Sequence, residues 1–328
     1  MKKLRFLAVF SVIMLSLQGL YAQYTGQQNF SLAEVNTTQT DGWDIATLVG
    51  CNMEVDVGKP YLPVKHLHIA IPEDKDVVGI QILSMQQQEL TGTYNIMPTQ
   101  LEQIPGEAVP EFVNPDPAIY NMNAQYPAEY IYSPTAGFKS GVHIAGILFY
   151  PLRYNPVTRK LYLITQIQYQ LVYADANHNP VKPRRMLHTS YMALKDEIKS
   201  TVSNPTDIDT YFQLEKTDVF SGKAFLPNEF PDFNGQAVEY VIITNQTLAE
   251  SFQEIADWKT RKGVPAVVRT VEWIYSHYPG VDQAEKVRNF IIEAYQNWGT
   301  QYFMLGGDSD VVPIRYAWTS HWNYYAGT

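Results

Sequence analysis

The sequence predicts a β-sandwich-like domain followed by an α/β domain with a parallel sheet. Residues 23–175 contain several segments in which apolar and polar residues alternate with the two-residue period of half-buried strands. After residue 237 the pattern changes to short apolar strands separated by segments of helical period, which is typical of a parallel sheet. The clearest strands of the first domain are His66–Pro72, Val77–Leu83, Val142–Tyr150 and Leu161–Val172, the last two joined by a hairpin-type connection.

The second domain alternates strands with helices. Asn245 or Thr247 is placed to cap the first helix, and Gly263 follows it in the position of a C′ glycine. Asp282 is placed to cap a second helix, whose apolar residues recur at helical spacing as far as Trp298. The strands are short and apolar, at Val238–Thr244, Val264–Val271 and Tyr302–Leu305.

The third of these strands runs into a turn that carries two carboxylates, Asp308 and Asp310. In parallel sheets, ligands bind beyond the carboxyl ends of the strands, so this turn marks the edge at which function is expected. The two aspartates offer the oxygen ligands that calcium prefers. The alternative is a turn in which they accept local backbone N–H groups. Since the sequence stops at Thr328, within an unfinished sheet that has exposed edges, we expect the α/β domain to be truncated.

Residues 1–22 have the three parts of a secretory signal peptide. A positive start carries Lys2, Lys3 and Arg5, and an apolar stretch follows that is short for a membrane span. Ala22 is a small residue suited to the position before signal cleavage. We therefore expect an exported protein, either secreted or held at a bacterial cell surface or outer membrane.

Charge and cysteine content exclude some functions. The net charge of −9 gives no electrostatic reason to bind nucleic acid. The single cysteine, Cys51, allows no internal disulfide, so the fold depends on core burial. Cys51 lies in a β-like stretch without a helix start or a histidine beside it, which favours a small buried side chain over a nucleophile.

The seven histidines do not cluster along the sequence. His66 and His68 share one strand face, which would allow a metal pair, but no third ligand is evident. The sequence therefore predicts no histidine metal site.

Residues 176–237 are expected to form a linker between the two domains. The segment begins with an exposed polar stretch and ends in a Pro-, Gly- and Asp-rich stretch without periodicity, with a short helix near residues 191–203. Arg184 and Arg185 form a dibasic candidate for proteolytic processing, the alternative being a solvated pair of charges. Lys216 and Lys223 are further candidate cleavage points, nearer the second domain.

Four segments of the second domain, taken together, follow the pattern of a known family. They are the strand Tyr240–Thr244, the helix end Ile255–Gly263, the helix segment Val287–Ile291, and the strand end Tyr302–Asp308 with Val312-Pro313. In these segments the chain resembles the gingipain family of cysteine peptidases, peptidase family C25. The β-rich part resembles the N-terminal prodomain of that family at Gly58–Pro63 and Ile69–Pro72.

The resemblance implies the N-terminal portion of a cysteine endopeptidase zymogen. Its parts would be a signal peptide at 1–22, a prodomain at 23–175, a linker with processing sites at 176–237, and the start of a caspase-like catalytic domain at 238–328. The family uses a histidine base and a cysteine nucleophile at later strand ends, where a neighbouring imidazole activates the thiolate. Neither has a counterpart in this sequence, so we expect both beyond Thr328 and expect the fragment to be inactive.

The resemblance also implies what the protein binds. The prodomain would inhibit its own catalytic domain and assist its folding, and an Arg or Lys of the linker would occupy the specificity pocket. The substrates would be proteins and peptides, with no cofactor required and a structural calcium ion as an option at Asp308 and Asp310. The secretion machinery is a further expected partner.

Two alternatives stay open at this point. One is a sorting or processing peptidase of the type IX secretion system, whose catalytic domain is built alike. The other is a non-catalytic cell-surface or binding protein on the same scaffold, which agrees with the absence of a later cysteine.

Overall fold

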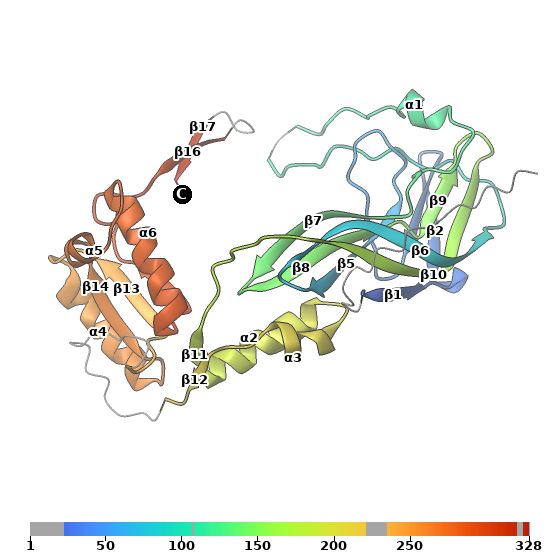
Figure 1. Cartoon of the computed structure of the whole chain (residues 1–328). Helices are drawn as coiled ribbons and strands as arrows, with labels where there is room; N and C mark the ends of the chain where they lie inside the picture. The colour runs from blue at the N-terminus through green and yellow to red at the C-terminus, as the bar shows by residue number, and fades with distance from the viewer. Residues whose placement is uncertain (1–22, 107, 221–234, 320–323, 328) are drawn as a thin grey trace, which may run out of the picture.

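The computed structural model describes residues 23–106, 108–220, 235–319 and 324–327. It shows a β-rich lobe and an α/β lobe, with a long connection leading from one to the other (Figure 1). Among the described residues, no helix has the length and apolar character needed to cross a membrane.

The β-rich lobe is a sandwich of two antiparallel sheets. Its strands are β1 (Thr25–Asn29), β4 (Asn52–Met53), β5 (Pro63–Ile71), β6 (Lys75–Glu89), β7 (Ile131–Lys139), β8 (Val142–Phe149), β9 (Leu152–Asn155) and β10 (Lys160–Asp175). One sheet has the order β1-β10-β6, with β9 also paired to β10, and the other has the order β4-β5-β8-β7. The strands expected from the sequence are confirmed, although β6 is longer than expected. The expected hairpin between β8 and β10 is wrong, because these strands lie in different sheets and β10 pairs instead with the short strand β9.

Alternating side chains of the two sheets form the main core of this lobe. Ile69 of β5 and Phe149 of β8 face Ile167 and Tyr169 of β10, and all four are fully buried. Full burial of an Ile or Phe side chain contributes about 1.5–3 kcal/mol. The smaller elements of the lobe are the hairpin β2 (Val35–Thr40) and β3 (Trp43–Leu48), and the short helices η1 (Leu32–Glu34) and α1 (Pro117–Tyr120).

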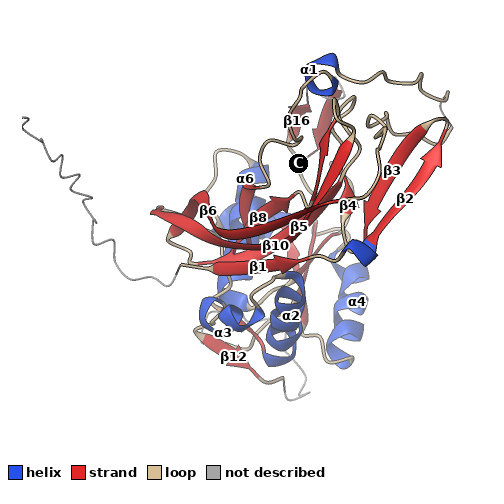
Figure 2. Ribbon diagram, turned by 90° about the vertical axis from the view of Figure 1, so that its right-hand side faces the viewer, coloured by secondary structure: helices blue, strands red, loops and turns tan. Residues whose placement is uncertain are grey.

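The segment 176–237 is not an extended linker in its described part. It contains β11 (Arg185–Leu187), α2 (His188–Thr201), η2 (Pro205–Asp207), α3 (Ile208–Tyr211) and β12 (Lys216–Asp218). Strand β11 pairs with β12 in parallel. Helices α2 and α3 lie against the sandwich (Figure 2), where Ile198 and Phe212 pack on Ala70 and Val142. The short helix expected near residues 191–203 is confirmed, but the sequence did not show that it would fold onto β5 and β8.

The α/β lobe is built on the parallel sheet that the sequence predicts. Its strands β13 (Tyr240–Thr244), β14 (Ala266–Thr270) and β15 (Tyr302–Leu305) have the order β14-β13-β15. The helical elements are α4 (Ala249–Arg261), α5 (Val271–His277), α6 (Gln283–Glu293) and the π-helical turn η3 (Ala294–Trp298). A hairpin of β16 (Tyr316–Thr319) and β17 (Tyr324–Gly327) follows.

Local capping sets two of these helix starts. The Asp282 carboxylate accepts a hydrogen bond from Glu285 N at 2.8 Å, which confirms the predicted cap of α6. Helix α4 begins at Ala249 without a side-chain cap, although Asn245 Oδ1 accepts from Leu248 N in the preceding turn. Thr270 caps α5, because its hydroxyl oxygen accepts a hydrogen bond from Trp273 N. The sequence did not predict α5, because its first residue, Val271, continues the apolar pattern of β14.

Candidate functional site

The carboxyl edge of the parallel sheet is held together by hydrogen bonds between β13 and β15. Thr244 Oγ1 donates to the Gly306 carbonyl at 2.6 Å, and Gly306 N donates to the Ile243 carbonyl at 2.7 Å. Thr244 is fully buried, so its hydroxyl is satisfied only by this bond across the strand ends. These two bonds join the strand ends into one platform at the edge where a ligand is expected.

Gly306 and Gly307, which follow β15, require glycine for different structural reasons. A Cβ atom on Gly306 would lie 2.8 Å from the Phe252 ring, so the strand end passes directly over α4. Gly307 has a φ of +138°, which side chains rarely adopt, and a Cβ atom there would lie 2.4 Å from the Val311 side chain. This geometry forces the chain to turn back and brings Val312 into the core.

Asp308 and Asp310 form a local turn at this edge. Asp308 Oδ1 accepts from Asp310 N at 3.0 Å, and the Asp308 carbonyl accepts from Val311 N and Val312 N. Both side chains are exposed, and among the described residues no third Asp, Glu, His or Cys lies close enough to share an ion with them. The turn alone accounts for this arrangement, and calcium binding here stays a prediction.

A groove of about 470 Å³ lies next to this turn. It runs between α6 and the segment after β15, and Arg315, which pairs with Asp282 at 2.8 Å, is one of its lining residues. The side chain of Leu305, on the edge strand, is half exposed in it. The remaining apolar lining comes from Val287, Ile291, Val312, Pro313 and Ile314.

The predicted dibasic processing site is folded. The Arg185 side chain is fully buried, and its Nε donates to Asp218 Oδ2 at 2.6 Å while a terminal nitrogen donates to the Gly235 carbonyl. Arg184 is half exposed and makes a bidentate pair with Glu215 at 2.8 and 2.9 Å. The expectation of an exposed dibasic site is wrong for Arg185, because the folded chain brings the partly buried carboxylate of Asp218 in β12 next to it.

Strand β11, which carries Arg185, lies away from the carboxyl edge of the parallel sheet. Arg184 N donates to the Gln296 carbonyl at 2.9 Å, which places β11 against η3 at the amino-terminal end of the sheet. The hypothesis that a basic residue of this segment occupies the specificity pocket stays a prediction. Lys216 lies in β12, 3.5 Å from Asp218. Lys223 and Ala22 lie outside the described residues, and their roles in processing stay predictions.

Cys51 has no features of an activated nucleophile. It is half-buried against the cluster formed by Leu48, Leu62 and neighbouring residues of the sandwich. Desolvation raises the pKa of its thiol, whereas a catalytic cysteine needs a lowered pKa to form the thiolate. This agrees with the reading of Cys51 as a small packing residue.

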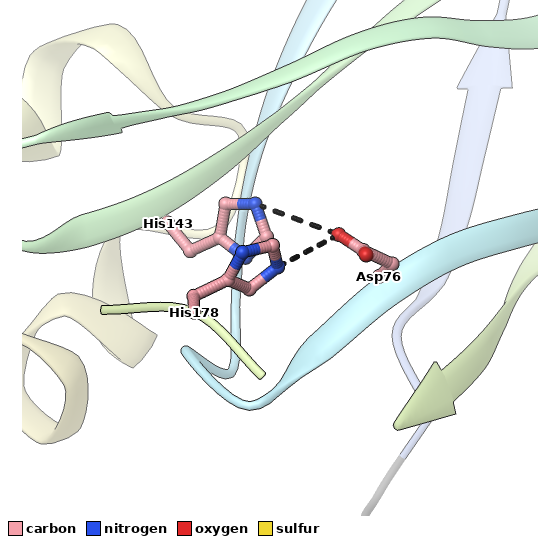
Figure 3. A group of neighbouring side chains, drawn as sticks. All are labelled: Asp76, His143 and His178. Carbon is pink, nitrogen blue, oxygen red and sulfur yellow. Dashed lines mark hydrogen bonds and ion pairs between the residues drawn. The ribbon is translucent and has the colours of Figure 1, made fainter. Parts of the chain in front are cut away.

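Two of the histidines are brought together by the fold, contrary to the expectation from the sequence. His143 at the start of β8 and His178 after β10 converge on Asp76 of β6 (Figure 3). The distance from Asp76 Oδ1 is 3.0 Å to His178 Nε2 and 4.0 Å to His143 Nε2. Among the described residues, this is the one group of three potential metal ligands that lie close together. The residues lie 67 and 35 positions apart in sequence order, so no spacing motif could have shown it.

The environment of His143 favours its neutral form. The side chain is 2% exposed, and the ring of Phe138 stacks on it with centroids 4.3 Å apart and planes 13° apart. Desolvation lowers the pKa of His143, and the neighbouring His178 lowers it further. His66 and His68 are both exposed on β5 and acquire no third ligand among the described residues.

Two protein-family models match this chain, one mainly over each lobe. Residues 18–204 match the family model Propeptide_C25, and residues 233–327 match Peptidase family C25. The chain belongs to the C25 propeptide family, whose model matches more than half of it. It comprises that propeptide and the start of the peptidase domain, as the sequence pattern implied.

Several gingipains of Porphyromonas gingivalis are similar to this chain. Gingipain R2 of strain ATCC BAA-308 / W83 is 21% identical over 305 residues, which cover 89% of this chain and 35% of the relative. Lys-gingipain of strain ATCC 33277 is 22% identical over 313 residues, which cover 89% of this chain and 16% of the relative. The chain thus spans about a third or less of the length of these curated relatives.

Two solved structures resemble parts of the chain. The complex of P. gingivalis RgpB pro- and mature domains matches with a TM-score of 0.46 and 20% identity, over 58% of this chain and 96% of that one. The structure on zymogenic latency of gingipain K from P. gingivalis matches with a TM-score of 0.41 and 22% identity, over 47% of this chain and 88% of that one.

Proposed function

We propose that this chain is the N-terminal part of an exported cysteine endopeptidase zymogen, in which the β-rich lobe inhibits the peptidase and assists its folding. The observation that carries the proposal is the order of the two family matches, propeptide first and peptidase second, on one chain. Each match coincides with a lobe that has its own buried core. These matches do not favour a sorting peptidase or a non-catalytic surface protein. The substrates would be peptide bonds of other proteins.

The chemistry of the proposed reaction requires a thiolate and an imidazole at the carboxyl edge of the parallel sheet. Cys51 cannot supply the thiolate, because it lies in the sandwich and its pKa is raised. We place the nucleophile and base at further strand ends of the same edge, beside the platform of Thr244 and Gly306. Backbone N–H groups at such an edge would stabilise the oxyanion.

Activation would require a cut between the two lobes. Cleavage after Arg184 or Arg185 first needs β11 to separate from β12, which exposes the buried pair of Arg185 and Asp218. Lys216 is held in β12. Lys223 is the remaining basic candidate in this region, so we propose it as the first processing site.

A Lys223→Gln variant of the full-length protein is expected to stay uncut and inactive under conditions that convert the wild type to an active, shorter enzyme. Mass spectrometry of the mature N-terminus and hydrolysis of a fluorogenic peptide would measure both effects. A Lys216→Gln variant serves as the control and should be processed normally. The proposal fails if the uncut Lys223→Gln protein is active, or if the mature enzyme begins directly after Arg185.

A further inference from the structure

We propose that Asp76, His143 and His178 form a zinc site in the propeptide. One ligand atom from each residue lies within 4.8 Å of the other two. Zn²⁺ bound tetrahedrally at about 2.0–2.1 Å from its ligands places them about 3.3 Å apart. The separations of 3.0 and 4.0 Å between Asp76 Oδ1 and the two Nε2 atoms bracket that value, so small side-chain rotations would seat the ion.

The type of ligand selects the metal. Two imidazole nitrogens and one carboxylate suit zinc, whereas calcium prefers a shell of oxygen ligands. The side chains of Asp76 and His178 are 46% and 28% exposed, so water can reach the ion from solvent and complete its coordination. Three protein ligands and one water is an arrangement that zinc adopts in proteins.

The residues around the site fix the ring of His143, and two neighbouring lysines pair with carboxylates other than Asp76. The stacked ring of Phe138 fixes the orientation of His143. The nearest lysines are occupied by other carboxylates. Lys75 pairs with Asp74 and Asp175, and Lys182 pairs with Glu73. The contacts of Asp76 are with the two imidazoles, so its carboxylate faces the ring nitrogens that would share the ion.

The position of the site suggests what the ion does. Asp76 and His143 belong to the two sheets of the sandwich, while His178 lies on the connection that leaves β10 for β11. A bound ion would tie that connection to both sheets at one point. Zinc would thus stiffen the start of the segment that joins the propeptide to the peptidase domain.

Calorimetric titration of the metal-free full chain with Zn²⁺ tests the proposal. One ion is expected to bind per chain, and its affinity should fall at least about tenfold in His178→Ala and in Asp76→Asn. Both residues are partly exposed, so these variants should keep the wild-type circular dichroism spectrum. Zn²⁺ should also raise the melting temperature of the wild type and not that of His178→Ala.

Control variants separate this site from other histidines. His188→Ala on α2 and the double variant His66→Ala/His68→Ala should bind Zn²⁺ as the wild type does. The proposal is overturned if His178→Ala retains full affinity, if the His66/His68 variant loses it, or if Ca²⁺ displaces Zn²⁺ at equal concentration.

Discussion

Replacing Arg185 with methionine is expected to lower the free energy of unfolding by about 1.5–3 kcal/mol, because the carboxylate of Asp218 loses its fully buried partner and keeps only Lys216, 3.5 Å away. Methionine has a similar length, so packing is largely kept and the loss reports on the charge. The Gly235 carbonyl also loses a donor. Strands β11 and β12 should therefore separate more readily, which would open the segment between the two lobes.

Urea unfolding of the full chain, followed by circular dichroism, and hydrogen exchange at β11 and β12 would measure this effect. Arg184→Met is the matched control, since Arg184 is adjacent and also makes a bidentate pair, but in solvent. If the two variants have the same stability and the same exchange rates, the pair of Arg185 and Asp218 does not hold β11 and β12 together.

The second large effect is expected from Gly307→Ala. A side chain at φ +138° costs about 1–3 kcal/mol in backbone strain. The added Cβ atom would also lie 2.4 Å from Val311, which costs a comparable amount or displaces the turn. Displacement would move Asp308 and pull Val312 from the core, so the complete enzyme should lose activity as well as stability.

A Gly263→Ala variant separates the effect of backbone strain from that of the contact with Val311. Gly263 also has a positive φ, +91°, but a Cβ atom there has nothing within 4 Å, so only the strain of about 1–2 kcal/mol applies. Thermal unfolding of both variants, together with peptidase assays of the complete protein, gives the comparison. Equal losses in the two variants would show that Val311 does not confine the turn.

Much of the architecture follows from periodicity. The two-residue alternation of β5, β8 and β10 and the short apolar strands β13 to β15 are local signals, because one buried face determines each pattern. The Asp282 cap is equally local. The sequence did not predict α5, because Val271 fits the apolar pattern of β14 as well as the start of the helix.

The site features that were missed depend on contacts between distant residues. Arg185 looks like an exposed processing residue until Asp218, on another strand, is placed beside it. His143 and His178 meet Asp76 only because β6, β8 and the end of β10 converge at one end of the sandwich. Such pairings are decided by the packing of sheets, and residue spacing along the chain does not encode them.

The zymogen proposal is tested most directly by adding residues 23–220, as a separate polypeptide, to the mature peptidase and following hydrolysis of a fluorogenic peptide. Interfaces between proteases and their inhibitors are among the tightest known, so inhibition is expected below about 1 μM. The inhibition should be reversible and should disappear when the propeptide is unfolded. Full peptidase activity in the presence of micromolar folded propeptide would contradict the proposal that the β-rich lobe keeps the enzyme latent.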